Sequence, residues 1–126
     1  MKKIFIMLML AACAKSAKDT ETYNCSRCGY YCVNEKNPIC CFENGAALRK
    51  IDAETYVLET KEVAYENEKP RASDELQSSL IFYKVEKNRY STKRGADFDD
   101  YTLVFDGHVA EYNDSPDSGG ECRLAE

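Results

Sequence analysis

The sequence predicts an all-β fold: a small antiparallel barrel or sandwich held together by disulfide bonds. Three observations carry this prediction. Short segments rich in aromatic and β-branched residues alternate with tight-turn signals, and no long amphipathic helical pattern interrupts them. Seven cysteines among 126 residues indicate disulfide bonds in a domain too small for a large core. Nine Tyr and five Phe residues supply much of that core, because the chain has no Trp.

The first half of the domain begins with a cysteine-dense segment. Residues 23–41 hold five cysteines and are predicted to be rich in loops. Asn44-Gly45 follows and indicates a hairpin turn, because both central positions of such a turn favour positive φ. The strand formers Tyr56-Val57-Leu58 predict a strand, which residues 63–65 continue more weakly up to Pro70.

The second half contains clearer strand signals. Residues 72–79 could form one helical turn or a loop. Residues 80–85 form the most apolar segment and are expected to be a central strand. Two further strands are expected at 101–105 and 108–112, joined by a hairpin turn at Asp106-Gly107. A turn-rich loop at 115–120 precedes a last short strand around Cys122.

The N-terminus has the order of a secretory signal. Lys2 and Lys3 precede an unbroken apolar run at residues 4–10, which is too short to span a bilayer that needs about 20 residues. Leu10-Ala11-Ala12-Cys13 resembles the lipobox that bacterial lipoprotein signal peptidase cleaves. Cys13 is therefore expected to carry lipid through its sulfur and to become the first mature residue. Ordinary cleavage after Ala12, or an uncleaved N-terminus, is the alternative.

This interpretation divides the chain into a signal peptide (1–12), a lipidated tether (13–22) and a disulfide-rich β domain (23–126). It places the protein in the cell envelope, anchored to the membrane through its N-terminal lipid. Ala14 lacks the acidic character that would suggest retention in the inner membrane, so the outer membrane is preferred. The oligomeric state is not predicted.

The charge balance narrows the choice of partners. The chain carries 17 basic and 22 acidic residues, a net charge of −5. Removal of Lys2 and Lys3 with the signal would leave 15 basic against 22 acidic residues, a net charge of about −7. Such a surface argues against nucleic acid, which needs a basic footprint, and favours a basic protein partner.

Six cysteines remain if Cys13 is lipidated, and an even number in an exported domain predicts disulfides. They are Cys25, Cys28, Cys32, Cys40, Cys41 and Cys122. Six cysteines allow 15 pairings, and the residues alone do not choose among them. Zinc binding is one alternative, although the adjacent pair Cys40-Cys41 is unlike a second Cys-x-x-Cys knuckle. A redox-active Cys25/Cys28 pair is another alternative, although no thioredoxin-like strand-loop-helix pattern surrounds it.

No catalytic constellation is apparent, and the protein is not expected to be an enzyme or to hold a cofactor. His108, the single histidine, could neighbour Asp106 and Asp114, but no nucleophile motif accompanies it, so it is expected to be an exposed turn residue. Asp97, Asp99 and Asp100 lack the spacing of a calcium loop and are expected to form a solvated acidic loop. No metal ligands are assigned.

The order of several short motifs resembles the lipoprotein inhibitors of c-type lysozyme. The motifs are Tyr23-Asn24-Cys25, residues 42–48, residues 56–58, Arg89-Tyr90-Ser91, and the run from Tyr101 through Gly107 to Glu111. The resemblance implies an eight-stranded antiparallel barrel in which Cys122 bridges back to Cys25. It also implies a c-type lysozyme as partner, contacted around Arg89, Tyr90 and Ser91 and around Asp106 and Gly107.

Two departures from the family affect this implied contact. The family has Ser-Gly where this chain has Glu86-Lys87-Asn88, and Lys-Gly where it has Asp106-Gly107. In the family, the Ser and Lys side chains contact the catalytic carboxylates of lysozyme. Those carboxylates would repel Asp106. A structural or surface-interaction lipoprotein that does not inhibit lysozyme is therefore the alternative, and a small zinc-binding module is a further one.

Overall fold

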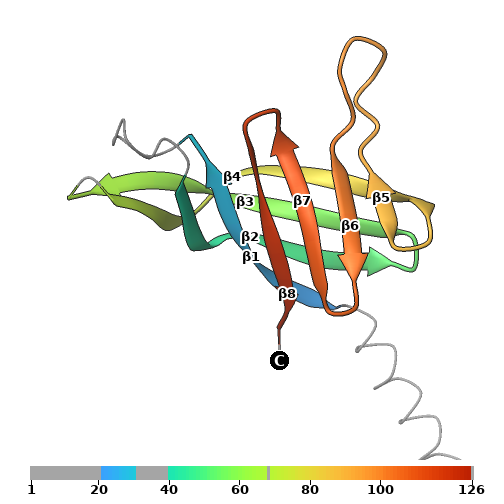
Figure 1. The fold of residues 1–126 in the computed structure, drawn as a ribbon, viewed down its shortest axis with the longest axis horizontal. Coiled ribbons are helices and arrows are strands. Elements are labelled where there is room, and N and C mark those ends of the chain that lie inside the picture. The colour runs from blue at the N-terminus through green and yellow to red at the C-terminus, as the bar shows by residue number, and fades with distance from the viewer. Residues whose placement is uncertain (1–20, 31–39, 68, 126) are drawn as a thin grey trace, which may run out of the picture.

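A computed structural model describes residues 21–30, 40–67 and 69–125, which form eight β-strands and no helix (Figure 1). The strands are β1 (Thr22–Gly29), β2 (Cys40–Asp52), β3 (Thr55–Glu66), β4 (Lys69–Glu86), β5 (Arg89–Ser91), β6 (Thr102–Asp106), β7 (Val109–Ser115) and β8 (Ser118–Leu124). The predicted all-β class is confirmed. Nothing helical in the described residues is long and apolar enough to cross a membrane.

The strands form one closed antiparallel barrel in which each strand pairs with its neighbour in the chain and β8 pairs with β1. Because the strands alternate in direction, the connections alternate between two ends. We call one the tyrosine end: it holds the start of β1, the β2–β3, β4–β5 and β6–β7 turns and the end of β8. The other is the arginine end, which holds the β3–β4 hairpin, the β5–β6 loop and the β7–β8 turn (Figure 1).

The hairpin predicted at Asn44-Gly45 was wrong, because β2 runs straight through these residues. Cys25 pairs with Ala46 and Arg27 with Phe42, so residues 43–45 of β2 stand opposite Ser26 of β1 alone. Asn44 has a φ of 57°, as a bulged residue can. A Cβ on Gly45 would lie 2.7 Å from the Cβ of Arg27, so this glycine permits close packing instead of a turn.

The β3–β4 hairpin extends well beyond the barrel wall (Figure 1). The helical turn or loop expected at 72–79 was wrong, because these residues belong to β4 and pair with β3, with Pro70 opposite Tyr65. Cross-strand pairing has overridden a weak local preference. Residues 80–85 are a strand as predicted, yet only Phe82 within them is buried.

The cysteine-dense segment is more regular than predicted, since residues 22–29 form β1 and residues 40–41 begin β2. Alternate residues of β1 point inward, which buries Tyr23, Cys25 and Arg27. Residue 22, expected in the tether, is the first of β1. The signal peptide, Cys13, residues 14–20 and Cys32 lie outside the described residues.

Two disulfides each join a pair of described cysteines on neighbouring strands. Cys25 on β1 bonds to Cys122 directly opposite on β8, as the resemblance implies. Cys28 bonds to Cys41 on β2, and Cys40 is disulfide-bonded as well. Cys25 and Cys28 thus belong to different bridges, so the hypothesis that they form a redox pair with each other was wrong.

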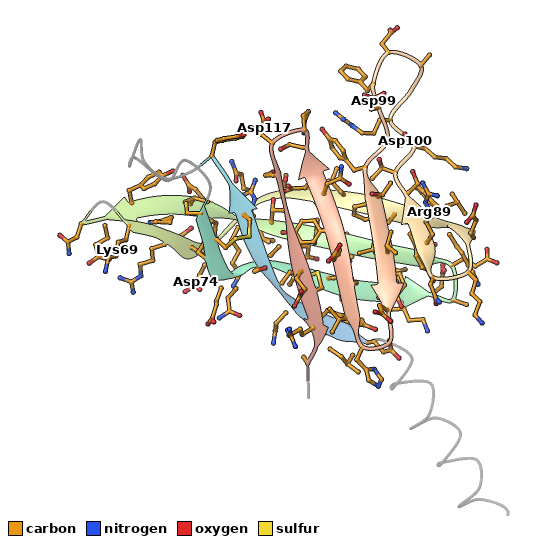
Figure 2. All side chains as sticks on the ribbon, in the orientation of Figure 1. Lys69, Asp74, Arg89, Asp99, Asp100 and Asp117 are labelled. Atoms are coloured by element: carbon orange, nitrogen blue, oxygen red, sulfur yellow. A yellow bond between two sulfur atoms is a disulfide. The ribbon has the colours of Figure 1, made fainter. Side chains whose placement is uncertain are left out.

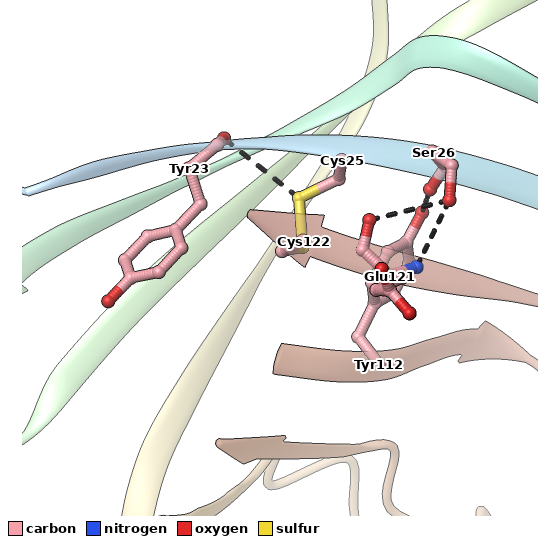
Figure 3. Close-up of a disulfide and its surroundings, with 6 residues drawn as sticks. All are labelled: Tyr23, Cys25, Ser26, Tyr112, Glu121 and Cys122. Carbon is pink, nitrogen blue, oxygen red and sulfur yellow. Dashed lines mark hydrogen bonds between the residues drawn. A yellow bond between two sulfur atoms is a disulfide. The ribbon is translucent and has the colours of Figure 1, made fainter. Parts of the chain in front are cut away.

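Polar contacts flank the Cys25–Cys122 bridge along the β1–β8 seam (Figure 3). The amide of Glu121 donates to Ser26 Oγ at 3.1 Å, and the Tyr112 hydroxyl donates to the Ser26 carbonyl at 2.8 Å. Both cysteines are almost fully buried in the core. The last strand is therefore joined to the first covalently and by hydrogen bonds.

Candidate functional site

The turns of the tyrosine end bring the two predicted contact segments together. Lys87 and Asn88 form the β4–β5 turn, and Gly107 and His108 form the β6–β7 turn, one residue later than predicted. The Phe105 amide donates to the Asn88 carbonyl at 2.8 Å. This hydrogen bond joins β6, which leads into the β6–β7 turn, to the β4–β5 turn. Gly107 has a φ of 64°, and no atom lies within 4 Å of the position a Cβ would take. Glycine is therefore favoured here by the backbone conformation and not by lack of space.

The five predicted contact residues play different parts in this arrangement. Arg89 on β5, which Figure 2 labels, and Asp106 on β6 are exposed and lie on neighbouring strands. Arg89 pairs with Val104 of β6. Tyr90 is only 7% exposed and belongs to the core. Ser91 is half-buried, and its hydroxyl donates to the Thr92 carbonyl at 3.2 Å. Arg89, Asp106 and Gly107 can therefore meet a partner, whereas Tyr90 supports them from beneath.

An aromatic cluster closes the barrel under these turns. Tyr56 contacts Tyr90 edge-on with ring centroids 4.9 Å apart, and Phe105 lies 5.5 Å from Tyr90. Tyr23 packs against both Tyr56 and Phe105 at 6.3 and 5.6 Å. Edge contacts of this kind are favourable beyond the apolar area that they bury. The turns thus rest on a packed floor contributed by β1, β3, β5 and β6.

Acidic side chains surround this floor. The Tyr23 hydroxyl donates to Glu21 Oε2 at 3.1 Å. Burial raises the pKa of Tyr23 to about 12, and Glu21 acts in the same direction. Burial also raises the pKa of Tyr90, and the nearby carboxylates of Glu54 and Asp52 raise it further. The tyrosines stay protonated at neutral pH and act as hydrogen-bonding and packing groups.

A polar cluster closes the arginine end, and sequence analysis did not identify it. Arg27 Nε lies 3.2 Å from Asp114 Oδ2, with side chains only 10% and 3% exposed. Arg27 Nη1 donates to the Lys61 carbonyl and to Gln77 Oε1, both at 2.9 Å. Ser118 Oγ donates to the other Asp114 oxygen. The buried guanidinium is thus paired with a charge and hydrogen-bonded to two further elements.

The remaining polar candidates lie apart from one another. His108 is exposed in its turn, as predicted, while Asp114 belongs to the Arg27 cluster at the other end of the barrel. Asp97, Asp99 and Asp100 are exposed on the β5–β6 loop, as predicted. Cys25, Cys28 and Cys41 are in disulfides, so their sulfurs are not thiolate ligands while those bridges are intact.

These features define a class of protein: a small antiparallel β-barrel closed by a disulfide between its first and last strands. Comparison of the chain with protein families, with curated proteins and with solved structures gives no match.

Proposed function

We propose that this protein is a lipid-anchored envelope protein whose barrel binds a basic protein through the tyrosine-end turns, as inhibitors of c-type lysozyme do. One observation carries the proposal. The β4–β5 and β6–β7 turns, which the resemblance assigns to lysozyme contact, lie side by side through the Phe105–Asn88 hydrogen bond. They project from the closed eight-stranded barrel with a first-to-last disulfide that the same resemblance implies.

The positive charge required by this proposal lies on a different turn from that of the family. Asp106 occupies the position of the family lysine, but Lys87 sits at the tip of the adjacent β4–β5 turn and is exposed. Arg89 follows on β5, also exposed. We assign to Lys87 the attraction to the carboxylates of a lysozyme cleft, with Arg89 as its neighbour. The net charge of about −7 that remains after removal of Lys2 and Lys3 would speed the encounter with a basic enzyme.

The test is inhibition of cell-wall lysis. The purified lipoprotein, in nonionic detergent and with its disulfides intact, is mixed with a c-type lysozyme and a suspension of bacterial cell walls. We expect slower lysis at micromolar protein, and loss of about tenfold or more in potency for Lys87→Glu. Lys69→Glu is the matched control, because Lys69 is exposed at the start of β4 on the other side of the barrel (Figure 2). Unimpaired lysis at micromolar wild-type protein would refute lysozyme inhibition.

The anchor is tested separately. Mass spectrometry of the protein from membranes is expected to show a mature chain that starts at Cys13 and carries the added mass of lipid. A Cys13→Ser variant should fail to acquire that mass and should leave the membrane fraction. A Cys13→Ser protein that remains quantitatively with the membrane would contradict lipid attachment at this residue.

A second function is favoured by Asp106, since its exposed carboxylate would be repelled by the acidic cleft of lysozyme. In this alternative the barrel is a surface-interaction lipoprotein for another basic protein. The lysis assay separates the two, and an Asp106→Lys variant that gains inhibition absent from the wild type would support the alternative for the natural chain.

A further inference from the structure

The β5–β6 loop, residues 92–101, projects from the arginine end, opposite the point where the described chain enters β1 (Figure 1). Its tip presents Phe98, which is 62% exposed, the largest exposed fraction among the large hydrophobic residues described. A single exposed hydrophobic residue needs no explanation by itself. Phe98 differs from such a residue because several contacts hold the loop around it in place.

The base of the loop is closed by hydrogen bonds. The Thr92 amide donates to the Tyr101 carbonyl at 3.0 Å, and the Tyr101 amide donates to Thr92 Oγ1 at 2.8 Å. Thr92 is 3% exposed and Tyr101 belongs to the core. The two strands that carry the loop are therefore held together at its base.

Arg94 organises the tip. Its guanidinium carbon lies 4.1 Å from the Tyr101 ring centroid and 5.1 Å from that of Phe98, so one cation bridges the buried ring and the exposed one. Its amide donates to Asp100 Oδ1 at 3.0 Å, and its Nη1 donates to the Asp99 carbonyl at 3.3 Å. The backbone on both sides of Phe98 and the cation over its ring are thus held in place, which lowers the entropy cost of binding a partner.

The charge around Phe98 specifies the kind of partner. Within the loop, Asp97, Asp99 and Asp100 are exposed and outnumber the two cations, Lys93 and Arg94, of which Arg94 is held against the Tyr101 ring. Asp117 on the β7–β8 turn adds a fourth carboxylate at the same end (Figure 2). An aromatic anchor with a charged rim is the usual anatomy of a protein interface. The acidic rim is repelled by anionic lipid and by nucleic acid.

We propose that the β5–β6 loop is a second binding surface, in which Phe98 enters an apolar pocket bordered by Lys or Arg residues on a basic protein. It is independent of the tyrosine end, from which the barrel separates it. The described chain enters β1 at the other end of the barrel, so the loop and the proposed Cys13 anchor attach at opposite ends.

The experiment places a photocrosslinking benzoylphenylalanine, the probe, at position 98 of the full chain in its own cell envelope. We expect a protein crosslink whose mapped segment is basic, and a fall of about tenfold or more in its yield when Asp97, Asp99 and Asp100 are all changed to Asn. The same probe at Val104, which is 45% exposed on the barrel wall, is the positional control and should not give this product.

Three outcomes would overturn the proposal: crosslinking only to lipid, a mapped segment that is not basic, or a yield unaffected by the three Asn changes. A Lys87→Glu chain separates this surface from the tyrosine end. It should keep the position-98 product even if lysozyme inhibition is absent. Loss of the product in that chain would assign the contact to the tyrosine end and refute a second surface. Unchanged thermal unfolding of each variant verifies the fold.

Discussion

The two ends of the barrel are closed by opposite chemistry. At the tyrosine end, four aromatic rings from four strands pack together, mostly edge to face. At the arginine end, the space is filled by one guanidinium paired with Asp114 and hydrogen-bonded to two other groups. Removal of apolar surface from water stabilises the first end. At the second end, the buried guanidinium has lost its hydration, and its ion pair and hydrogen bonds must compensate for that loss.

This difference determines how each end responds to substitution. A packed aromatic end can lose a hydroxyl and keep most of its buried area. A buried ion pair cannot lose one partner without leaving the other uncompensated. The exposed turns proposed for partner contact therefore stand on the end that is more tolerant of change, and the projecting β5–β6 loop stands on the end that is less tolerant.

The largest effect is expected from removal of the Cys25–Cys122 disulfide, which joins the first strand to the last and so affects both ends of the barrel. Cys25→Ala with Cys122→Ala frees the first strand from the last, and closing a loop of that length is worth about 4–5 kcal/mol in the chain-entropy model. Chemical denaturation should show this loss, and amide hydrogen exchange should rise at both ends. A rise confined to one end would show that the ends unfold separately.

The matched control is Cys28→Ala with Cys41→Ala, which removes the bridge with the shorter separation of 13 residues. It should cost less, about 3 kcal/mol. An equal or larger cost would contradict the loop-length account.

A smaller effect is expected from breaking the ion pair at the arginine end. Asp114→Ala leaves the Arg27 guanidinium buried without its carboxylate and should lower the free energy of unfolding by about 3–5 kcal/mol. The double variant Arg27→Met with Asp114→Leu removes both charges and should recover most of that loss. A double variant as unstable as Asp114→Ala would show that packing around Arg27, not the unpaired charge, sets the cost.

The exposed pair of Arg49 and Glu59 is the matched control for burial. Its atoms lie 3.0 Å apart, slightly closer than the 3.2 Å of the buried pair, but the side chains are 56% and 30% exposed. Glu59→Ala should cost no more than about 1 kcal/mol, because solvent screens such pairs.

The smallest effect concerns the tyrosine end at high pH. The folded state holds the proton of Tyr23 up to a pKa of about 12, whereas the unfolded chain releases it near the ordinary tyrosine pKa of 10.0. The unfolded state therefore binds fewer protons above pH 10, and stability falls as the pH rises from 10 towards 12. Tyr23→Phe should make the decline shallower in denaturation curves recorded across this range.

Tyr30→Phe is the control for this measurement, since Tyr30 is 61% exposed. It should leave the slope unchanged. A Tyr23→Phe variant with the wild-type slope would mean that other groups, such as lysines, account for the whole alkaline transition.

The predictable parts of the fold were those set by local alternation and turn chemistry. Strands around Tyr56, Leu103 and Ala110 and the turn at Gly107 followed from such patterns. The bulge at Asn44 did not, because an Asn-Gly pair looks the same in a turn and in a bulged strand. Only the position of Arg27 on the facing strand shows why Gly45 is needed.

The candidate site was predictable only in part. Adjacent turns could be expected from the resemblance, but the inward direction of Tyr90 depends on the register between β5 and β6. Arg27 left one signal that was overlooked: it continues the every-second-residue inward pattern of Tyr23 and Cys25. A buried arginine on that face is usually paired with a carboxylate, but the identity of Asp114, 87 residues later in the sequence, is a property of the closed barrel.

The bridge between Cys25 and Cys122 also determines what a protease can release. A single cut in any turn or loop between these cysteines leaves two pieces that are still covalently joined. The piece that carries the N-terminus keeps hold of the piece that carries the C-terminus, and both remain aligned along the β1–β8 seam. A nicked molecule therefore stays whole until a reductant reaches a bond that the core shields from solvent.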